Sequence, residues 1–384
     1  MNTNKMISLA PRLAAGVLLL AGSGLSWADD VMILTPGAPI DIQGGGQTGI
    51  NTNINLSVMT FGGTNNGGKL NNRGGFVDGQ GAIGATLNNS GTLTNTDYAT
   101  LNNQGGTNGG QGATLNNYGG LENDRYATLN NQGGTNGGLG ATLNNYGPLY
   151  NRATLTNDGI INNSGYFEVF QGGVVNGTGT FTQTENDSRL RVDGTMTQST
   201  IDIQEGFLDG FGTLTGAVTV GRNAILSPGN PGLDSGTYAR DPLDIVGSLA
   251  LNGTLNIEIA SLTDFDRLFV SGGGVTVGDD SRVVFDFVSG FLPSADQSFQ
   301  FLFSTGGIVG SLPEIAFADP LSGLDWSLTS VSGFNGQTSG SWMQLLFSDA
   351  QADPNGVPTP APLTLLLAGL APLGWHLRRN PTRG

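Results

Sequence analysis

This 384-residue chain contains two pairs of carboxylates that are candidates for acid–base catalysis. Asp264 with Asp266, and Asp279 with Asp280, could act as the acid and base of a glycosidase, a reaction that needs two carboxyl groups. Adjacent acids in Gly/Ser-containing turns are more often solvated than catalytic. We therefore predict no catalytic residues, and keep a polysaccharide-acting hydrolase or lyase as the alternative.

Other reactive groups are scarce. The chain has no cysteine and one histidine, His376, which lies in a basic C-terminal flank. This composition excludes a Ser-His-Asp triad, a histidine metal site and zinc-thiolate ligands from the body of the protein. The segment 74–78 is the one weak match to a calcium-binding repeat. We therefore expect no cofactor or metal beyond isolated calcium sites.

Polar and aromatic residues recur between residues 85 and 157, and they suggest recognition instead of catalysis. Outward-facing tyrosines can stack on sugar rings, whereas tyrosines over a coil edge contribute packing; both readings apply to Tyr98, Tyr118, Tyr126, Tyr146 and Tyr150. A flat array of threonines can bind ice, and one threonine column is available, made of Thr86, Thr100, Thr114, Thr128 and Thr142.

A 14-residue repeat positions these side chains. The string Ala-Thr-Leu-Asn-Asn begins at Ala85, Ala99, Ala113, Ala127 and Ala141. Residues 99–123 and 127–151 differ at only three positions, so a 28-residue unit is duplicated on top of the shorter one. Self-similarity of fixed period is typical of a solenoid, in which each repeat buries its apolar side against its neighbours.

The repeats predict strands, because their glycine and asparagine are poor helix formers and good turn formers. We predict an all-β fold, a parallel β-helix or β-solenoid with repeats of about 14 residues, continuing into a further β-rich C-terminal region. One inward stack should hold Leu87, Leu101, Leu115, Leu129 and Leu143. One amide ladder should hold Asn89, Asn103, Asn117, Asn131 and Asn145. The alternative is that one leucine per repeat buries too little surface for complete folding.

Beyond residue 157 the segments gain Val, Ile and Phe and should form better-packed coils. The N-terminus combines Lys5 and Arg12, the apolar run 13–20 and a small-residue cleavage site at Ala28, just before Asp29. This pattern indicates a secretory signal peptide and passage through the secretion translocon; the apolar run is shorter than the ~20 residues of a membrane anchor.

The C-terminus carries a tripartite tail: Val357-Pro358-Thr359-Pro360, the apolar run 363–375, and Arg378-Arg379. The tail resembles the PEP-CTERM sorting signal of Gram-negative bacteria that make exopolysaccharide. The family has Pro-Glu-Pro where this chain has Pro358-Thr359-Pro360. The resemblance implies transient retention in the inner membrane and an exosortase-type sorting enzyme as partner; the alternative is an uncut C-terminal anchor.

Residues 227–347 resemble the C-terminal passenger region of autotransporter-type and PEP-CTERM surface proteins, which implies further β-structure and a solenoid end. The carrying motifs are Ser227-Pro228-Gly229-Asn230, the alternating strand 248–259, Asp264-Phe265-Asp266-Arg267-Leu268, and Val283-Val284-Phe285-Asp286-Phe287. The predicted parts are a signal peptide (1–28), an N-terminal cap with first turns (29–84), Gly/Asn-rich repeats (85–157), diversified coils (158–235), a C-terminal β-rich region (236–350), a linker (351–356) and the sorting tail (357–384).

The net charge of −15 disfavours nucleic acid, because an acidic surface repels phosphates. We predict an exported, non-catalytic, adhesin-like structural protein of the cell surface or extracellular matrix of a Gram-negative bacterium. Its expected partners are exopolysaccharide, in a biofilm or matrix, or copies of itself.

Overall fold

The computed structural model describes the backbone of four N-terminal strands (31–34, 40–42, 53–61 and 69–72). It describes residues 84–350 in full, apart from 97, 125, 230–241, 320 and 322. The predicted signal peptide, linker and sorting tail, and the segment 74–78, lie outside the described residues. The described part is all-β and contains no helix, which confirms the predicted fold class.

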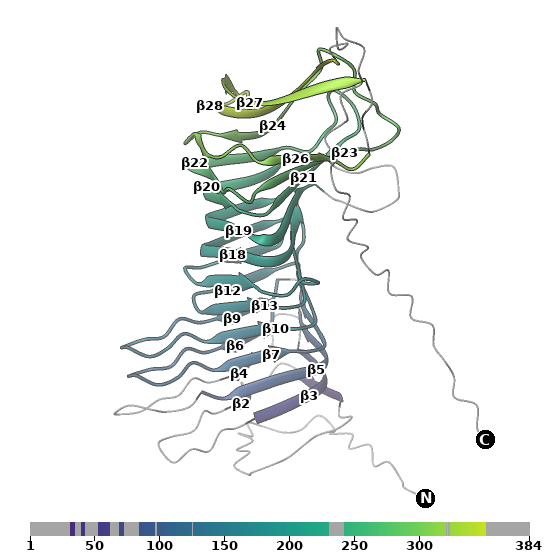
Figure 1. Cartoon of the computed structure of the whole chain (residues 1–384). Helices are drawn as coiled ribbons and strands as arrows, with labels where there is room; N and C mark the ends of the chain where they lie inside the picture. The colour runs from purple at the N-terminus through teal and green to yellow at the C-terminus, as the bar shows by residue number, and fades with distance from the viewer. Residues whose placement is uncertain are drawn as a thin grey trace, which may run out of the picture.

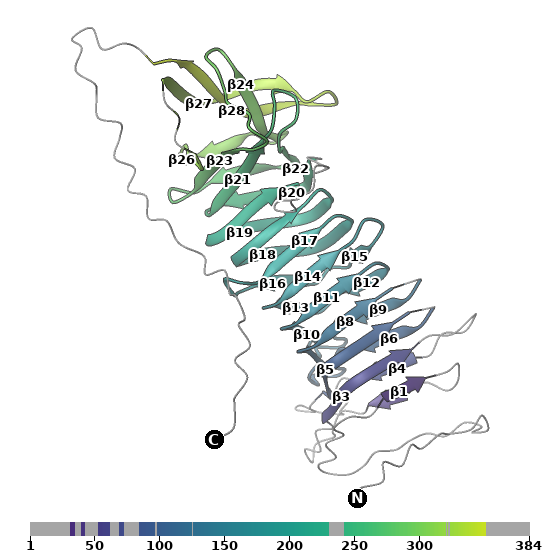
Figure 2. The ribbon, with the colours of Figure 1, turned by 90° about the vertical axis from the view of Figure 1, so that its right-hand side faces the viewer.

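Parallel strands stack into a solenoid whose successive coils run from the N-terminal to the C-terminal end of the rod (Figures 1 and 2). Each complete coil has three faces. Face 1 contains β7 (Thr114–Asn117), β10 (Thr142–Asn145), β13 (Ile160–Asn163), β16 (Thr180–Gln183) and β25 (Ile308–Gly310). Face 2 contains β8 (Gly120–Asn123), β11 (Pro148–Asn151), β14 (Tyr166–Val169), β17 (Arg189–Val192), β21 (Thr254–Ile259), β23 (Arg282–Phe287) and β26 (Glu314–Phe317). Face 3 contains β6 (Thr100–Asn103), β9 (Thr128–Asn131), β12 (Thr154–Asn157), β15 (Val174–Asn176) and β24 (Ser298–Ser304).

Longer strands bend from one face to the next without a break. They are β5 (Thr86–Asn95), β18 (Thr195–Gly210), β19 (Thr213–Pro228), β20 (Leu243–Leu251) and β22 (Leu268–Val277). The N-terminal strands are β1 (Val31–Leu34), β2 (Ile40–Ile42), β3 (Asn53–Phe61) and β4 (Lys69–Asn72). They join the same stack, since β3 pairs with β5 and β4 pairs with β6.

One coil in the repeat region takes 28 residues, so it contains two 14-residue repeats. Leu87 pairs in register with Leu115, and Leu115 with Leu143; Leu101 pairs with Leu129. The prediction of a single inward stack of five leucines is therefore wrong, because the two repeats of a coil differ in structure. The repeat from Ala113 supplies β7 and β8, whereas the repeat from Ala127 supplies β9 and a Gly-rich loop.

The core is three parallel columns of inward side chains, one per face. Each column begins with buried leucines (Leu87, Leu93 and Leu101) and continues into larger groups such as Phe181, Phe167 and Met196. The change to larger side chains agrees with the expectation of better-packed coils after residue 157, because larger apolar side chains bury more surface per coil.

The Gly-rich loops between successive coils also stack on each other. In the loop 104–112, Asn108 and Gly109 have positive φ, and the Gly110 N–H donates to the Thr107 carbonyl, which makes a tight Asn-Gly turn. A Cβ on Gly138 would lie 2.1 Å from the carbonyl oxygen of Gly106 in the neighbouring loop. Only glycine permits this backbone approach.

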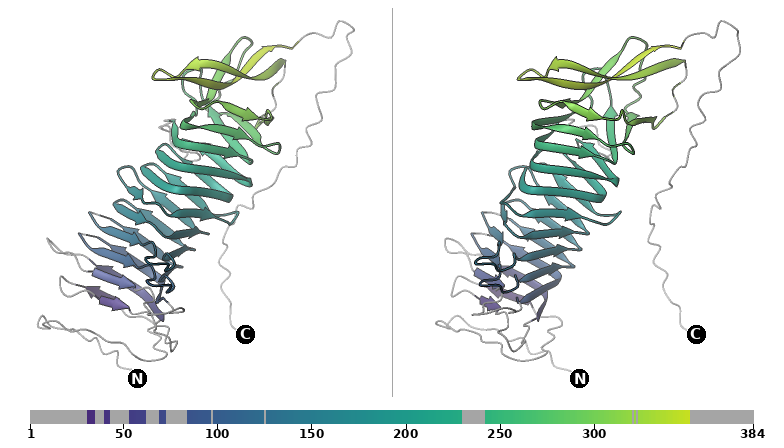
Figure 3. Two further views of the ribbon diagram at one scale, coloured as in Figure 1. Left: turned by 90° about the vertical axis from the view of Figure 1, so that its left-hand side faces the viewer. Right: turned by 60° about the vertical axis from the view of Figure 1, so that its left-hand side comes forward.

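Strand pairing continues across residue 235, because β19 pairs with both β20 and β21. At the C-terminal end, β28 (Ser339–Asp349) pairs antiparallel with β24 and with β27 (Leu324–Phe334). The two further views show this hairpin lying across the last coils (Figure 3). Buried phenylalanines, among them Phe299 on β24 and Phe347 on β28, pack together and close the core at this end.

The coil length makes a prediction about deletions. Removing residues 113–140, one whole coil, should leave a folded solenoid, because the strands on both sides of the cut keep their faces. Removing residues 113–126 should disrupt folding of the N-terminal coils, because it places a face 3 segment after another face 3 segment. Circular dichroism and urea unfolding of the two variants measure the difference; equal stability of both would contradict a 28-residue coil.

Candidate functional site

Buried asparagine ladders occupy the corners of the solenoid. The last residue of each repeat strand is an asparagine whose side chain is fully buried. After face 1, the Nδ2 of Asn89 donates to the Oδ1 of Asn117 (2.7 Å), and Asn117 donates likewise to Asn145 (2.8 Å). Similar ladders follow face 2, from Asn95 through Asn123 to Asn151, and face 3, from Asn103 through Asn131 to Asn157.

Each ladder amide also donates a hydrogen bond to a backbone carbonyl of the next coil. The Nδ2 of Asn89 donates to the Gly120 carbonyl (2.8 Å), and that of Asn103 donates to the Thr142 carbonyl (2.8 Å). The side chain therefore uses its two amide hydrogens for two different bonds. In the later members Asn117, Asn123 and Asn131, the side-chain oxygen also accepts from the asparagine of the preceding coil. A buried amide without these bonds would destabilise the fold by about 1–3 kcal/mol.

The structure brings the five predicted ladder residues into two ladders instead of one. Asn89, Asn117 and Asn145 share the corner after face 1, whereas Asn103 and Asn131 share the corner after face 3. The third ladder, which begins at Asn95, was not predicted. Glutamines continue two of the ladders: Asn163 donates to Gln183, and Asn157 donates to Gln198.

In the repeats, between residues 86 and 145, the outer surfaces of faces 1 and 3 are arrays of threonine and asparagine. Thr86, Thr114 and Thr142 align on face 1, whereas Thr100 and Thr128 align on face 3, so the expected single threonine column is in fact two. Outer asparagines form ladders of their own, with Asn116 donating to Asn88 (2.7 Å) and Asn130 donating to Asn102 (2.8 Å). These faces offer amide and hydroxyl groups at a constant spacing.

The exposed tyrosines stack on one another across neighbouring coils. Tyr98 and Tyr126 lie 5.1 Å apart between ring centroids, and Tyr118 and Tyr146 lie 4.8 Å apart, both pairs nearly parallel. Tyr126 is 76% exposed, so these rings are outside the core. Because the paired ring faces are occupied by each other, each pair offers a ligand its edges and hydroxyls and only its outer ring faces.

Face 2 differs chemically from the other two faces in the middle of the rod. Its outward positions carry Tyr150, Tyr166, Glu168, Arg189 and Phe207, joined in register from coil to coil. At the following corner, Arg152 lies over the ring of Phe170 at 3.8 Å. We call the outward residues of face 2 from Tyr150 to Asp209 the face 2 patch.

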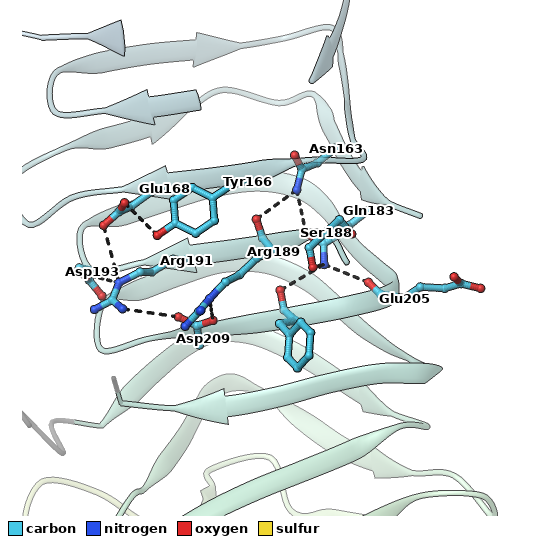
Figure 4. A network of polar contacts seen from close by, with 11 residues as sticks. Asn163, Tyr166, Glu168, Gln183, Ser188, Arg189, Arg191, Asp193, Glu205 and Asp209 are labelled. Carbon is cyan, nitrogen blue, oxygen red and sulfur yellow. Dashed lines mark hydrogen bonds and ion pairs between the residues drawn. The ribbon is translucent and has the colours of Figure 1, made fainter. Parts of the chain in front are cut away.

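An ion-pair network forms the base of the face 2 patch (Figure 4). The Nε of Arg189 donates to the Oδ2 of Asp209 at 2.5 Å, and the Nε of Arg191 donates to the Oδ2 of Asp193 at 2.8 Å. Arg191 also lies 3.7 Å from Glu168, which accepts the Tyr166 hydroxyl at 2.9 Å. Asp209 is only 1% exposed, so its charge depends on these arginines.

Burial sets the electrostatics of the network. It raises the pKa of Asp209, an effect opposed by the hydrogen bond and charge of Arg189. Burial also raises the pKa of the Tyr166 hydroxyl well above its ordinary value, and the negative charge of Glu168 adds to this. Tyr166 therefore stays neutral and donates its hydrogen bond throughout the physiological range.

Sequence inspection missed the face 2 patch. A signal was present in Arg189-Leu190-Arg191-Val192, where two cations of a chain with few basic residues alternate with buried apolar positions. Their partner Asp209 lies on the next coil, at a sequence separation that varies along the chain, so only the register reveals the pairing.

The two carboxylate pairs considered as catalytic are not arranged as pairs facing one bond. Asp264 is exposed, whereas Asp266 is buried and accepts the backbone N–H of Glu258 at 2.9 Å. Asp279 accepts the Ser311 hydroxyl, and Asp280 pairs with Arg222. Within the described ranges, no three His, Cys, Asp or Glu side chains form a group that could hold a metal ion. The expectation of isolated calcium sites stays a prediction.

No family model fits the chain, and no curated protein matches it. In the part of the chain that the structure describes, no helix is long and apolar enough to cross a membrane. The site therefore has to be interpreted from its own chemistry.

The corner ladders predict a contrast between two neighbouring asparagines. Asn117→Ala removes bonds to Asn89, Asn145 and the Pro148 carbonyl inside the core, and should lower the free energy of unfolding by about 2–4 kcal/mol. Asn116→Ala, the matched control on the outer surface, should cost about 1 kcal/mol or less, because water replaces its partners. Urea unfolding measures both; equal losses would contradict the structural role of the inner ladder.

A second prediction concerns Asp244, on β20. Burial raises its pKa, so between the unfolded and folded pKa values the native chain binds more protons than the unfolded chain. Its contribution to stability is therefore greatest below the unfolded pKa, and is lost as the pH rises through the folded pKa. Asp244→Asn should be more stable than the parent at pH 7, with the difference shrinking in acid; thermal unfolding across pH measures it. A variant less stable at pH 7 would contradict the burial argument.

Proposed function

We propose that this protein is an exported, non-catalytic structural protein of the cell surface or extracellular matrix, where it associates with exopolysaccharide. One observation carries the proposal: in the repeat region, stacked coils present hydroxyl and amide groups at a constant spacing along faces 1 and 3. Regular polar arrays of this kind suit repeated contacts with a glycan chain, in which each contact is weak and many act together.

The repeat organisation also supports a structural role. One coil corresponds to one 28-residue unit, and residues 99–123 and 127–151 are nearly identical. Duplication of a unit therefore lengthens the rod by one coil without disturbing its neighbours, since coils contact only the coils beside them. A protein whose length is adjusted in this way serves naturally as a spacer or scaffold.

Export and sorting enter the proposal through the two ends of the sequence. The proposed route is cleavage after Ala28, transfer by the secretion translocon, transient retention by the apolar C-terminal run, and processing at Pro358-Thr359-Pro360 by an exosortase-type enzyme. The mature protein is then released to the surface or matrix.

The alternative function, a polysaccharide-acting enzyme, is favoured by one observation. The face 2 patch places carboxylates beside a tyrosine and two arginines. Each of these carboxylates is engaged by an arginine or by the tyrosine, an arrangement that suits binding better than proton transfer. Release of reducing ends from candidate polysaccharides, tested on the purified chain, would favour the enzyme.

The proposal predicts the mass and location of the mature protein. Intact mass measured on culture supernatant and cell-envelope fractions should give a species that begins at Asp29 and ends between Pro358 and Ala361, outside the inner membrane. A species that keeps Arg379 and fractionates with the inner membrane would contradict the sorting route.

A further inference from the structure

Three side chains line up along the axis of the solenoid in the face 2 patch. Tyr166 is in register with Arg189, and Arg189 is in register with Phe207 on the next coil. Adjacent strands in a sheet lie about 4.8 Å apart, so a cation lies between two aromatic groups on one line. We call these three residues the Arg189 column.

The guanidinium of Arg189 is held in place and only partly used. Its Nε donates to Asp209, which is buried beneath it, whereas both Nη groups have no partner in the part of the chain that the structure describes. The Arg189 side chain is 32% exposed. Asp209 thus fixes the arginine from below, and four N–H donors remain for a ligand.

Phe207 is an exposed aromatic residue that does not contribute to the core. It is 42% exposed on a strand whose inward neighbour, Leu208, fills the core. Tyr166, at the other end of the column, is half-buried and fixed by its bond to Glu168. Exposed aromatic groups beside a fixed polar group are typical of binding surfaces.

The chemistry of the column selects a ligand with two features. A planar guanidinium with two free Nη groups binds a carboxylate in a bidentate manner, which a lysine cannot do. Aromatic groups on either side favour an apolar ring face next to that carboxylate. A uronate sugar has both, and the coil spacing is comparable to the length of one sugar ring along a chain.

The arginines of face 2 offset the acidic charge of the chain locally. The whole chain carries a net charge of −15, whereas around the face 2 patch Arg152, Arg189 and Arg191 balance the carboxylates of Glu168, Asp193 and Asp209. At this locally neutral place, the Nη groups of Arg189 can bind one carboxylate of a polysaccharide.

We propose that the Arg189 column binds a carboxylate-bearing sugar unit of an acidic polysaccharide, with Arg189 on the carboxylate and Phe207 and Tyr166 beside the ring. This inference names the ligand class for the proposed function and rests on it. Faces 1 and 3, with their threonine and asparagine side chains, contact neutral parts of the same polysaccharide.

The test compares polygalacturonate with its fully methyl-esterified form, using calorimetry or co-sedimentation with the full chain at low ionic strength. The parent should bind the acid form at least about tenfold more tightly than the ester, because only the acid form offers a carboxylate to the arginine fork. Arg189→Lys should lose about tenfold in affinity for the acid form, since it keeps the charge but not the fork. Phe207→Ala should weaken binding of both forms.

Two further variants keep the test decisive. Arg189→Gln alone would leave Asp209 buried without its main partner, so Arg189→Gln is combined with Asp209→Asn to avoid unfolding. Arg222→Gln, an exposed arginine of the same rod, is the matched control and should bind like the parent.

Two results would overturn the inference while leaving export and a matrix role standing: equal binding of the acid and ester forms, or parental binding by Arg189→Lys and by the double variant. Failure of the parent to bind either polysaccharide would overturn the inference and the glycan part of the proposed function together. The mass and location measurement tests export independently of both.

Discussion

The need to satisfy buried amides at the corners is the constraint on which the rest of the structure depends. A short coil must turn sharply three times, and at each corner backbone carbonyls point into the core, where water cannot reach them. Asparagine can bond these carbonyls: one amide hydrogen of Asn117 bonds the next asparagine, and the other bonds a backbone carbonyl. A leucine in its place would leave those carbonyls unsatisfied.

The ladders explain why so little apolar surface is enough in the repeat region. Each repeat coil buries three leucines and a few alanines, which is a thin core. Hydrogen bonds along the axis add to it, because each coil is bonded to the next by backbone and by side chains in the same direction. Where the ladders end, at Gln183 and Gln198, bulkier apolar residues such as Phe181 and Met196 take over, and the rod continues as an ordinary apolar β-helix.

The same geometry divides the surface by function. In the repeat region, faces 1 and 3 keep the same threonine and asparagine positions from coil to coil and form regular arrays. Face 2 is built from the part of the unit that varies, as the change from Glu122 to Tyr150 illustrates, and it can acquire aromatic and charged groups without disturbing the corners. A scaffold that fixes two faces and varies the third can acquire a binding patch by substitution alone, since outward side chains do not enter the core.

The sequence by itself determined the fold class, the inward leucines and the existence of amide ladders, because a fixed period and Gly/Asn turns leave few other ways to bury one leucine per repeat. It did not determine that a coil takes 28 residues, since both 14-residue repeats begin with the same five letters while only one of them supplies two strands. Which asparagines bond one another, and which side chains meet Arg189, were decided by the register between coils. Register depends on packing between segments that are distant in the chain, and local sequence pattern carries no information on that distance once the repeats diversify.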